Sequence, residues 1–115
     1  MYKVMAFLSR KPGTTREEFR EYYEKRHAPL ITRLTPKMGA YRRNYMNFNG
    51  AFKRDEHLIS FDVVTEMEFE DQAACERWFG AFKDPGIFAQ ISADEEKFLD
   101  RDRVLVCTVD REQTK

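Results

Sequence analysis

Apolar residues fall into four short stretches of strand character, separated by polar or turn-forming segments. Residues 2–9 mix β-branched, aromatic and aliphatic side chains and are followed by Pro12 and Gly13, which are typical of a turn. The same pattern predicts three further strands, over residues 40–49, 59–69 and 104–109. The chain is therefore expected to build a four-stranded sheet.

A helical stripe follows the first predicted strand. Thr15 and Glu18 have the spacing of a capping box, in which each side chain accepts from the other residue's backbone amide. From there, side chains recur three or four positions apart, as on one face of a helix: Phe19, Tyr23, His27, Leu30 and Leu34. Pro29 is expected to end or kink this helix toward its C-terminus, and Pro36 to stop it.

Two more helices are expected in the second half of the chain. Asp71 caps the first, and a shorter one covers about residues 86–99. The elements then read β-α-β followed by β-α-α-β, the order of a ferredoxin-like split βαβ fold. We predict an α+β domain over residues 1–110, with a four-stranded antiparallel sheet and its helices on one face, and a polar tail over residues 111–115.

The first and last predicted strands are apolar on both faces. Met5 and Phe7 alternate with other apolar residues, and Leu105 and Cys107 do the same near the C-terminus. An antiparallel sheet with one wet face alternates apolar and polar residues, so these strands need cover on both sides. We expect a second copy of the chain to cover the second face, giving a homodimer. The alternative is a larger third helix that covers it.

Charge and cysteine content narrow the function classes. The 115 residues carry 20 basic and 20 acidic side chains, so net charge favours neither nucleic acid nor an anionic membrane as a partner. No apolar run approaches the roughly 20 residues of a membrane span, and Lys3 interrupts the N-terminal stretch, which lacks a signal-peptide core. Cys75 and Cys107 form no CxxC motif. We expect a soluble cytoplasmic protein with reduced cysteines.

Several motifs of the chain occur together in one known family. They are residues 11–19 (KPGTTREEF), 22–23 (YY), 27–30 (HAPL), Tyr41 with Asn44, 62–69 (DVVTEMEF) with Asp71, and 84–100, which ends in FLD. This pattern resembles the EthD-like group of the dimeric α/β-barrel superfamily, in which two ferredoxin-like sheets pack face to face. The family usually has an aromatic residue where Met67 stands, so the pocket wall is expected to differ there.

The resemblance implies a hydrophobic pocket between sheet and helices that holds a flat, oxygenated molecule. The superfamily includes cofactor-free oxygenases, haem-processing enzymes, muconolactone isomerases, and polyketide cyclases, dehydratases and decarboxylases, so fold does not fix function. We expect a cofactor-independent lyase or isomerase that moves a proton on a small aromatic, polyketide-like or lactone substrate. The alternatives are a cofactor-free monooxygenase or haem-handling protein, and a non-catalytic accessory protein that binds a hydrophobic metabolite.

His27 is the first candidate for catalysis. It lies on the apolar stripe of the first helix, where Leu or Ala is usual, and an unperturbed pKa of about 6.5 suits an acid or base near neutral pH. The resemblance supports this role, because related isomerases and decarboxylases are thought to use a His in this helix. The alternative is a structural His that donates to a backbone carbonyl.

Acidic residues of the third predicted strand are the next candidates. Asp62, Glu66 and Glu68 share one face of that strand. If Met67 and Phe69 face the helices, these carboxylates point into the barrel or toward its rim. A carboxylate in an apolar barrel must be paired or protonated, which would make Glu66 a general acid or base and Asp62 a substrate contact. The alternative is a solvated edge or a salt bridge across the dimer with Arg42 or Arg43.

Tyr23, Tyr41 and His57 complete the candidate substrate contacts. The two hydroxyls suit a substrate carbonyl or hydroxyl, although aromatic packing explains both tyrosines equally well. His57 falls in the loop between the second and third predicted strands, and such loops often carry function. The chain has no nucleophile motif, Gly-rich phosphate loop or informative metal-ligand spacing, so neither a cofactor nor a metal is expected.

Overall fold

The computed structural model describes residues 1–53 and 61–115. Its strands are β1 (Tyr2–Arg10), β2 (Ala40–Tyr45), β3 (Val63–Phe69) and β4 (Leu99–Val109). Its α-helices are α1 (Arg16–Tyr22), α2 (Ala28–Leu34), α3 (Gln72–Gly80) and α4 (Pro85–Phe98). Shorter turns are the π-helical η1 (Tyr23–His27) and the 3₁₀ turns η2 (Phe48–Gly50) and η3 (Ala81–Lys83).

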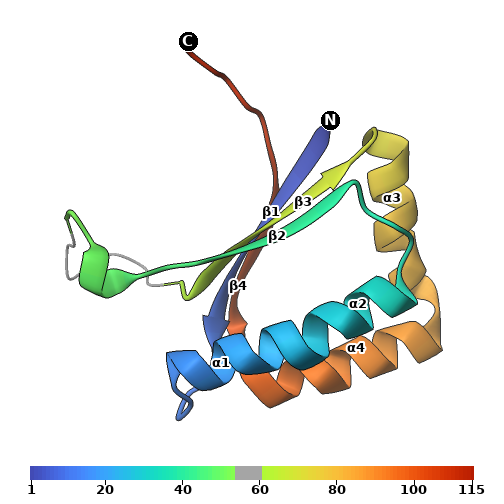
Figure 1. Ribbon diagram of the computed structural model, residues 1–115. Helices are drawn as coiled ribbons and strands as arrows, with labels where there is room; N and C mark the ends of the chain where they lie inside the picture. Colours follow the sequence, from blue (N-terminus) through green and yellow to red (C-terminus); the bar gives the residue numbers. More distant parts are fainter. Residues whose placement is uncertain (54–60) are drawn as a thin grey trace.

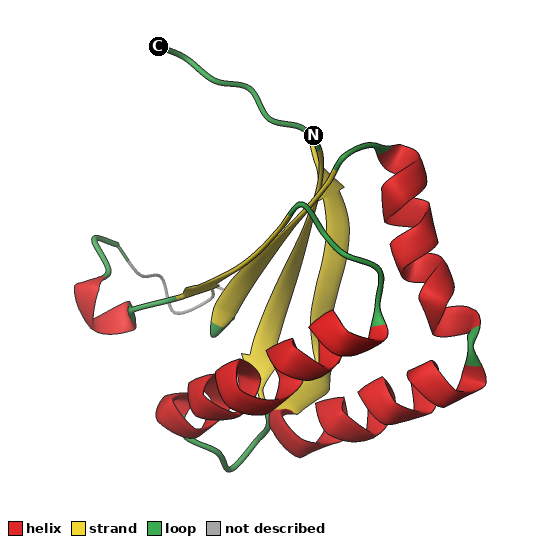
Figure 2. Cartoon of the chain, turned by 45° about the vertical axis from the view of Figure 1, so that its right-hand side comes forward, coloured by secondary structure: helices red, strands yellow, loops and turns green. Residues whose placement is uncertain are grey.

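The four strands pair in the order β2-β3-β1-β4, and every pair is antiparallel. The two halves of the chain therefore interleave, with β1 and β3 in the centre and β2 and β4 at the edges. Figures 1 and 2 show the α-helices together on one side of this twisted sheet. The predicted ferredoxin-like fold is confirmed.

The core lies between the helices and one face of the sheet. Alternate residues of β1 and β3 point into it and are buried: Val4, Ala6, Leu8, Val63, Thr65, Met67 and Phe69. The helices contribute Phe19, Ile31, Trp78, Ile91 and Phe98. Burying each large apolar side chain contributes roughly 1.5–3 kcal/mol, so this layer fixes the helices on the sheet.

Capping residues set the starts of the helices. The Glu18 amide donates to the Thr15 hydroxyl (3.1 Å) and the Thr15 amide to the Glu18 carboxylate (2.9 Å), so the predicted capping box is present. Asp71 caps α3, as predicted. Asp84 caps α4 in the same way by accepting from the amides of residues 86 and 87.

Three strand boundaries differ from the prediction, and two of the differences have identifiable reasons. β3 begins at Val63, and the described residues 61 and 62 lie outside the strand. β2 ends at Tyr45 because the Asn47 side chain accepts from the Asn49 amide and turns the chain into η2. β4 begins at Leu99, well before residue 104, because the chain leaves α4 directly into the sheet. The intervening residues 101–103 are charged and exposed, which hid the start of the strand in the sequence pattern.

The second face of the sheet carries both apolar and charged residues. Phe7 and Leu105 lie opposite each other in the β1–β4 register, and Leu105 is 49% exposed. Nearer the other end, Lys3 pairs with Glu66 at 3.0 Å and with Glu68 at 3.3 Å. In the described part of the chain, α4 packs beside α2 on the same sheet face as the other helices (Figure 2). Within these residues no third helix therefore covers the second face, which was the alternative to a dimer. Among the described residues, no helix is long and apolar enough to cross a membrane.

Candidate active site

A widened helical turn places Tyr23 and His27 on the inner side of the first helix. The turn η1 separates α1 from α2, and the Ala28 amide donates to the Tyr23 carbonyl five residues earlier. Pro29 has no amide hydrogen to donate to the carbonyl of Lys25, so the chain relaxes into a π turn and continues as α2. Both Tyr23 and His27 are buried as a result.

His27 is held by a carboxylate from α4. The distance from His27 Nδ1 to Asp94 Oδ2 is 2.8 Å, and the Tyr22 hydroxyl donates to the other carboxylate oxygen of Asp94 at 2.6 Å. Because a carboxylate only accepts, the imidazole proton lies on Nδ1. Nε2 then carries a lone pair, and among the described residues it has no hydrogen-bond partner. His27 therefore has the arrangement of an oriented general base.

Burial keeps this imidazole neutral. The side chain is 4% exposed, and its removal from water lowers the pKa of His27 below 6.5, while Asp94 opposes that shift in part. The ring also contacts Phe98, with ring centroids 4.7 Å apart. At neutral pH the group is ready to accept a proton.

Three hydroxyl groups form a chain beside His27. The Tyr41 hydroxyl donates to that of Tyr23 at 3.1 Å, and the Tyr23 hydroxyl lies 2.8 Å from Thr65 Oγ1. Burial raises the pKa of both tyrosines, so both stay protonated. Two hydrogen bonds among three hydroxyl groups leave one hydroxyl proton for a further acceptor.

These groups line one cavity of about 160 Å³ between the sheet and the helices. An apolar cavity of about 150 Å³ admits a molecule the size of benzene, so a small ring compound fits. Most of the wall is apolar, and its polar side chains are Tyr23, His27, Tyr41, Thr65, Trp78 and Glu95. An apolar pocket with a few convergent polar groups is the usual form of a small-molecule site.

Two wider grooves lie outside α1, α2 and α4 and offer poorer sites. Their volumes are about 510 and 530 Å³, and their rims include Lys25, Arg26 and Lys97, long charged side chains that remain in solvent. Neither groove reaches the hydroxyl chain or is lined by His27. Across residues 1–53 and 61–115, no cluster of three His, Cys, Asp or Glu side chains could hold a metal ion. The inner cavity is therefore the candidate active site.

The sequence model of the EthD domain matches residues 11–102, which includes every polar residue of this cavity. The chain belongs to the EthD family. The predicted resemblance is thereby confirmed.

Relatives of known structure or curated name agree with that assignment. The conidial pigment biosynthesis dehydratase EthD of Metarhizium robertsii is 29% identical over 104 residues, covering 82% of this chain and 70% of the relative. An EthD family protein from Bacillus halodurans has a TM-score of 0.63 at 19% identity, covering 97% of this chain and 100% of that one. A dimeric ferredoxin-like protein from Thermobifida fusca has a TM-score of 0.53 at 12% identity, covering 94% and 88%. The two structures support the fold of this EthD family member.

The structure brings three of the predicted site residues together and separates the others. His27, Tyr23 and Tyr41 line the same cavity. Glu66 lies on the opposite face of the sheet, since it follows the inward-facing Thr65, and its carboxylate accepts from Lys3 and from the Asn44 side chain. Glu66 and His27 are thus on different sides of β3.

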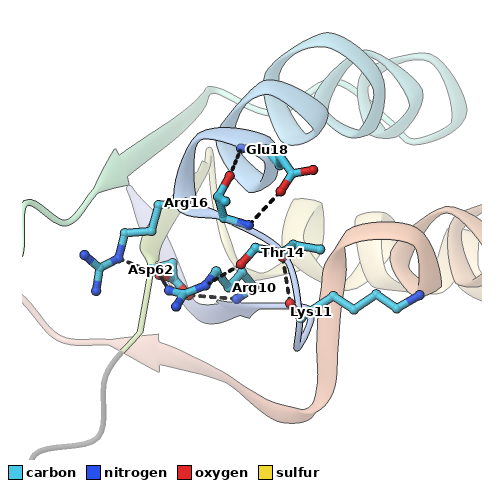
Figure 3. Close-up of polar contacts among 7 residues, drawn as sticks. Arg10, Lys11, Thr14, Arg16, Glu18 and Asp62 are labelled. Atoms are coloured by element: carbon cyan, nitrogen blue, oxygen red, sulfur yellow. Dashed lines mark hydrogen bonds and ion pairs between the residues drawn. The ribbon is translucent and has the colours of Figure 1, made fainter.

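Asp62 is buried but does not line the cavity. Figure 3 shows it beside Arg10 and Arg16. It accepts from the Arg10 backbone amide and the Arg10 guanidinium, each at 2.8 Å, and from the Arg16 guanidinium at 3.3 Å. These bonds join the start of β3 to the end of β1 and the first turn of α1, which is a structural role. His57 lies outside the described residues.

Sequence reasoning missed four polar groups of the site. Thr65 lies on β3 among apolar residues that share its face. Asp94 and Glu95 come from α4, where a run of acidic residues looks like a solvated helix face. Trp78 lies among the buried apolar residues of α3, which is typical of a core residue. Ile91 and Glu95 are four residues apart and lie on one helical face. The apolar Ile91, which is buried, was therefore the one sequence signal that Glu95 faces the interior.

Proposed function

We propose that this protein is a cofactor-independent dehydratase, a lyase that removes water from a small, flat, oxygenated ring compound. The observation that carries the proposal is His27, oriented by Asp94 through Nδ1 while its ring lines the cavity. The name of the Metarhizium robertsii relative, a dehydratase of pigment biosynthesis, favours water elimination over the other proton-transfer reactions of the superfamily. A polyketide-like or aromatic precursor is the substrate class.

The proposed reaction needs one base that takes a proton from the substrate carbon and then gives it to the departing hydroxyl group. His27 Nε2 takes a proton from the carbon next to a substrate carbonyl, and the electron pair of that C–H bond forms an enolate. The enolate collapses to a C=C bond as the C–O bond of the neighbouring hydroxyl breaks. The imidazolium gives its proton to the departing hydroxyl, so water leaves and neutral His27 is restored. Asp94 stabilises the transient imidazolium by accepting from Nδ1.

The hydroxyl chain supplies the stabilisation of the enolate oxygen. Tyr23, Tyr41 and Thr65 retain one hydroxyl proton that can be donated to the substrate carbonyl oxygen, where negative charge develops. The apolar remainder of the wall excludes water from the reacting carbon. Glu66, on the other face of the sheet, takes no part in this scheme.

We also propose that the protein works as a homodimer. The second sheet face exposes Leu105 of β4, opposite Phe7 of β1, together with the charged group around Lys3. A second copy related by a two-fold axis would cover this face. Native mass spectrometry gives the subunit count: a dimer is expected, and a monomer at micromolar concentration contradicts this part of the proposal.

The reaction can be tested with a bicyclic β-hydroxy ketone, a hydroxytetralone whose dehydration gives a fluorescent naphthol. We expect the purified protein, without added metal or cofactor, to accelerate naphthol formation, and His27→Ala to abolish the acceleration. Binding of the hydroxytetralone without any naphthol above the uncatalysed rate would show a binding protein instead. That outcome would exclude the proposed dehydration of this substrate class.

A further inference from the structure

One tryptophan in the wall of the cavity has a hydrogen-bond donor that the protein leaves unused. Trp78 is 5% exposed, and its indole Nε1–H is the only buried side-chain nitrogen or oxygen in the described chain without a hydrogen-bond partner. Leaving a buried donor unpaired destabilises the folded protein. Such groups are rare in folded proteins, so each one calls for an explanation.

Packing alone does not explain a tryptophan at this position. Its ring contacts those of Phe69, Phe79 and Phe82, with centroids 6.0, 4.9 and 5.1 Å away. A phenylalanine would keep an aromatic ring in this cluster without burying an unpaired N–H group. Because Trp78 also lines the candidate active site, a bound ligand is the partner that the cavity can supply.

A second polar group on the α3–α4 side of the cavity has no partner either. Glu95 lines the same cavity and makes no hydrogen bond or ion pair with any described residue, whereas its neighbours Asp94 and Glu96 both have partners. Burial raises the pKa of Glu95. Two polar side chains without a hydrogen-bond partner, one on α3 and one on α4, therefore line the cavity together with the hydroxyl groups of Tyr23, Tyr41 and Thr65.

We propose that Trp78 is a specificity-determining residue whose indole Nε1–H donates a hydrogen bond to a carbonyl or hydroxyl oxygen of the ligand, with the Glu95 carboxyl as a second ligand contact. This inference rests on the proposed function and narrows its substrate class. The substrate carries acceptor oxygens on two edges of its ring system. One meets the hydroxyl chain of Tyr23, Tyr41 and Thr65, and the other meets Trp78.

The test uses two flat bicyclic probes of similar size. N-methylphthalimide has a carbonyl acceptor on each side and no donor, whereas methylindane has neither. Trp78 is the only tryptophan, so the protein has a single indole N–H signal in a ¹⁵N-labelled sample. We expect N-methylphthalimide to shift that signal downfield, as a new hydrogen bond does, and methylindane to leave its proton shift nearly unchanged.

Variants separate the hydrogen bond from packing. Trp78→Phe is expected to weaken N-methylphthalimide binding about fivefold to tenfold, the effect of one hydrogen bond, and to change methylindane binding by less than about twofold. Phe82→Leu, a control on an apolar wall residue, should weaken both probes equally. Glu95→Gln, whose side-chain amide donates at any pH, should bind N-methylphthalimide more tightly than Glu95→Leu does.

The outcomes separate this inference from the proposed function. Equal indole shifts with both probes, or equal loss of both probes in Trp78→Phe, overturn the role of Trp78 even if the hydroxytetralone is dehydrated. A preference for the dicarbonyl probe that depends on Trp78, in a protein that dehydrates nothing, supports the inference and overturns the dehydratase proposal. Failure of both probes to bind at millimolar concentration overturns the role of Trp78, and the hydroxytetralone assay then decides the dehydratase proposal by itself.

Discussion

The two faces of the sheet treat polar groups in opposite ways. On the outer face the polar side chains are ionised and paired: Lys3 lies 3.0 Å from Glu66, and Arg42 lies 3.0 Å from Glu68. On the inner face the polar side chains are only partly satisfied, with a free imidazole nitrogen on His27 and an unpaired N–H on Trp78. Side chains of adjacent residues on β3, Thr65 and Glu66, belong to the two different sets.

This difference distinguishes polar side chains that stabilise the fold from polar side chains that are available to a ligand. A charge network that satisfies itself needs nothing further, and its members act on stability or on assembly. Polar groups kept in an apolar cavity without partners cost free energy, and that cost is recovered when a ligand binds. The contrast assigns ligand chemistry to the inner face, and each of the following predictions tests one side of it.

The largest expected difference is between His27 and Glu66. His27→Ala should lower kcat on the hydroxytetralone by about 10²–10⁴-fold, the usual contribution of a general base. Glu66→Gln, a carboxylate removed from the outer face, should leave kcat within about twofold. Steady-state rates of naphthol formation measure both. A large loss of kcat in Glu66→Gln with an unchanged dimer would place chemistry on the outer face and contradict the contrast.

Replacing Asp94 should lower kcat less than replacing His27 does. It should also shift the pH dependence of kcat/KM, which identifies Asp94 as the residue that orients His27. Asp94→Asn removes the carboxylate that orients His27 and favours its imidazolium form, so kcat should fall about 10–100-fold. In the wild type, kcat/KM should fall as the pH falls through the lowered pKa of His27, because only the neutral imidazole accepts a proton. Without Asp94 that pKa drops further, and the acid limb should move to lower pH. Tyr22→Phe, which removes only the hydroxyl bonded to Asp94, is the milder comparison.

The sequence predicted the scaffold better than the site, because the scaffold depends on periodic patterns. The apolar stretch that became β1, the stripe through Phe19 and His27, and the caps at Thr15 and Asp71 are local signals, and all appear in the structure. The cavity depends on which helices meet across the sheet. Asp94 and His27 are 67 positions apart along the chain. Their contact is a tertiary contact, which no local sequence pattern predicts. For the same reason Glu66 and Asp62 looked available, although their arginine and lysine partners lie on other strands and helices.

The outer-face network should act on stability rather than on the active site. Lys3 is 7% exposed, and Lys3→Ala leaves the Glu66 and Glu68 carboxylates without their most buried cation. We expect a loss of about 1–3 kcal/mol in the free energy of unfolding, measured by urea denaturation. Replacing all three residues together, by Met at Lys3 and Gln at Glu66 and Glu68, should recover most of that loss. A Lys3→Ala protein as stable as the wild type would mean that the network contributes nothing.

The smallest expected effect is on stability and concerns Glu95, a residue of the inner face. The pKa of Glu95 is raised by burial, so folding loses stability as the pH rises from the unfolded value near 4.5 through the raised folded value. Glu95→Gln removes that loss and should stabilise the unliganded protein by about 0.5–1 kcal/mol at pH 8, with a gain that vanishes at pH 4. Glu96→Gln, on the exposed side of the same helix, is the matched control and should not show this pH-dependent gain. Thermal unfolding at the two pH values measures the difference. If Glu95→Gln is destabilising at pH 8, the Glu95 carboxyl group has a partner within the protein and is not available to a ligand.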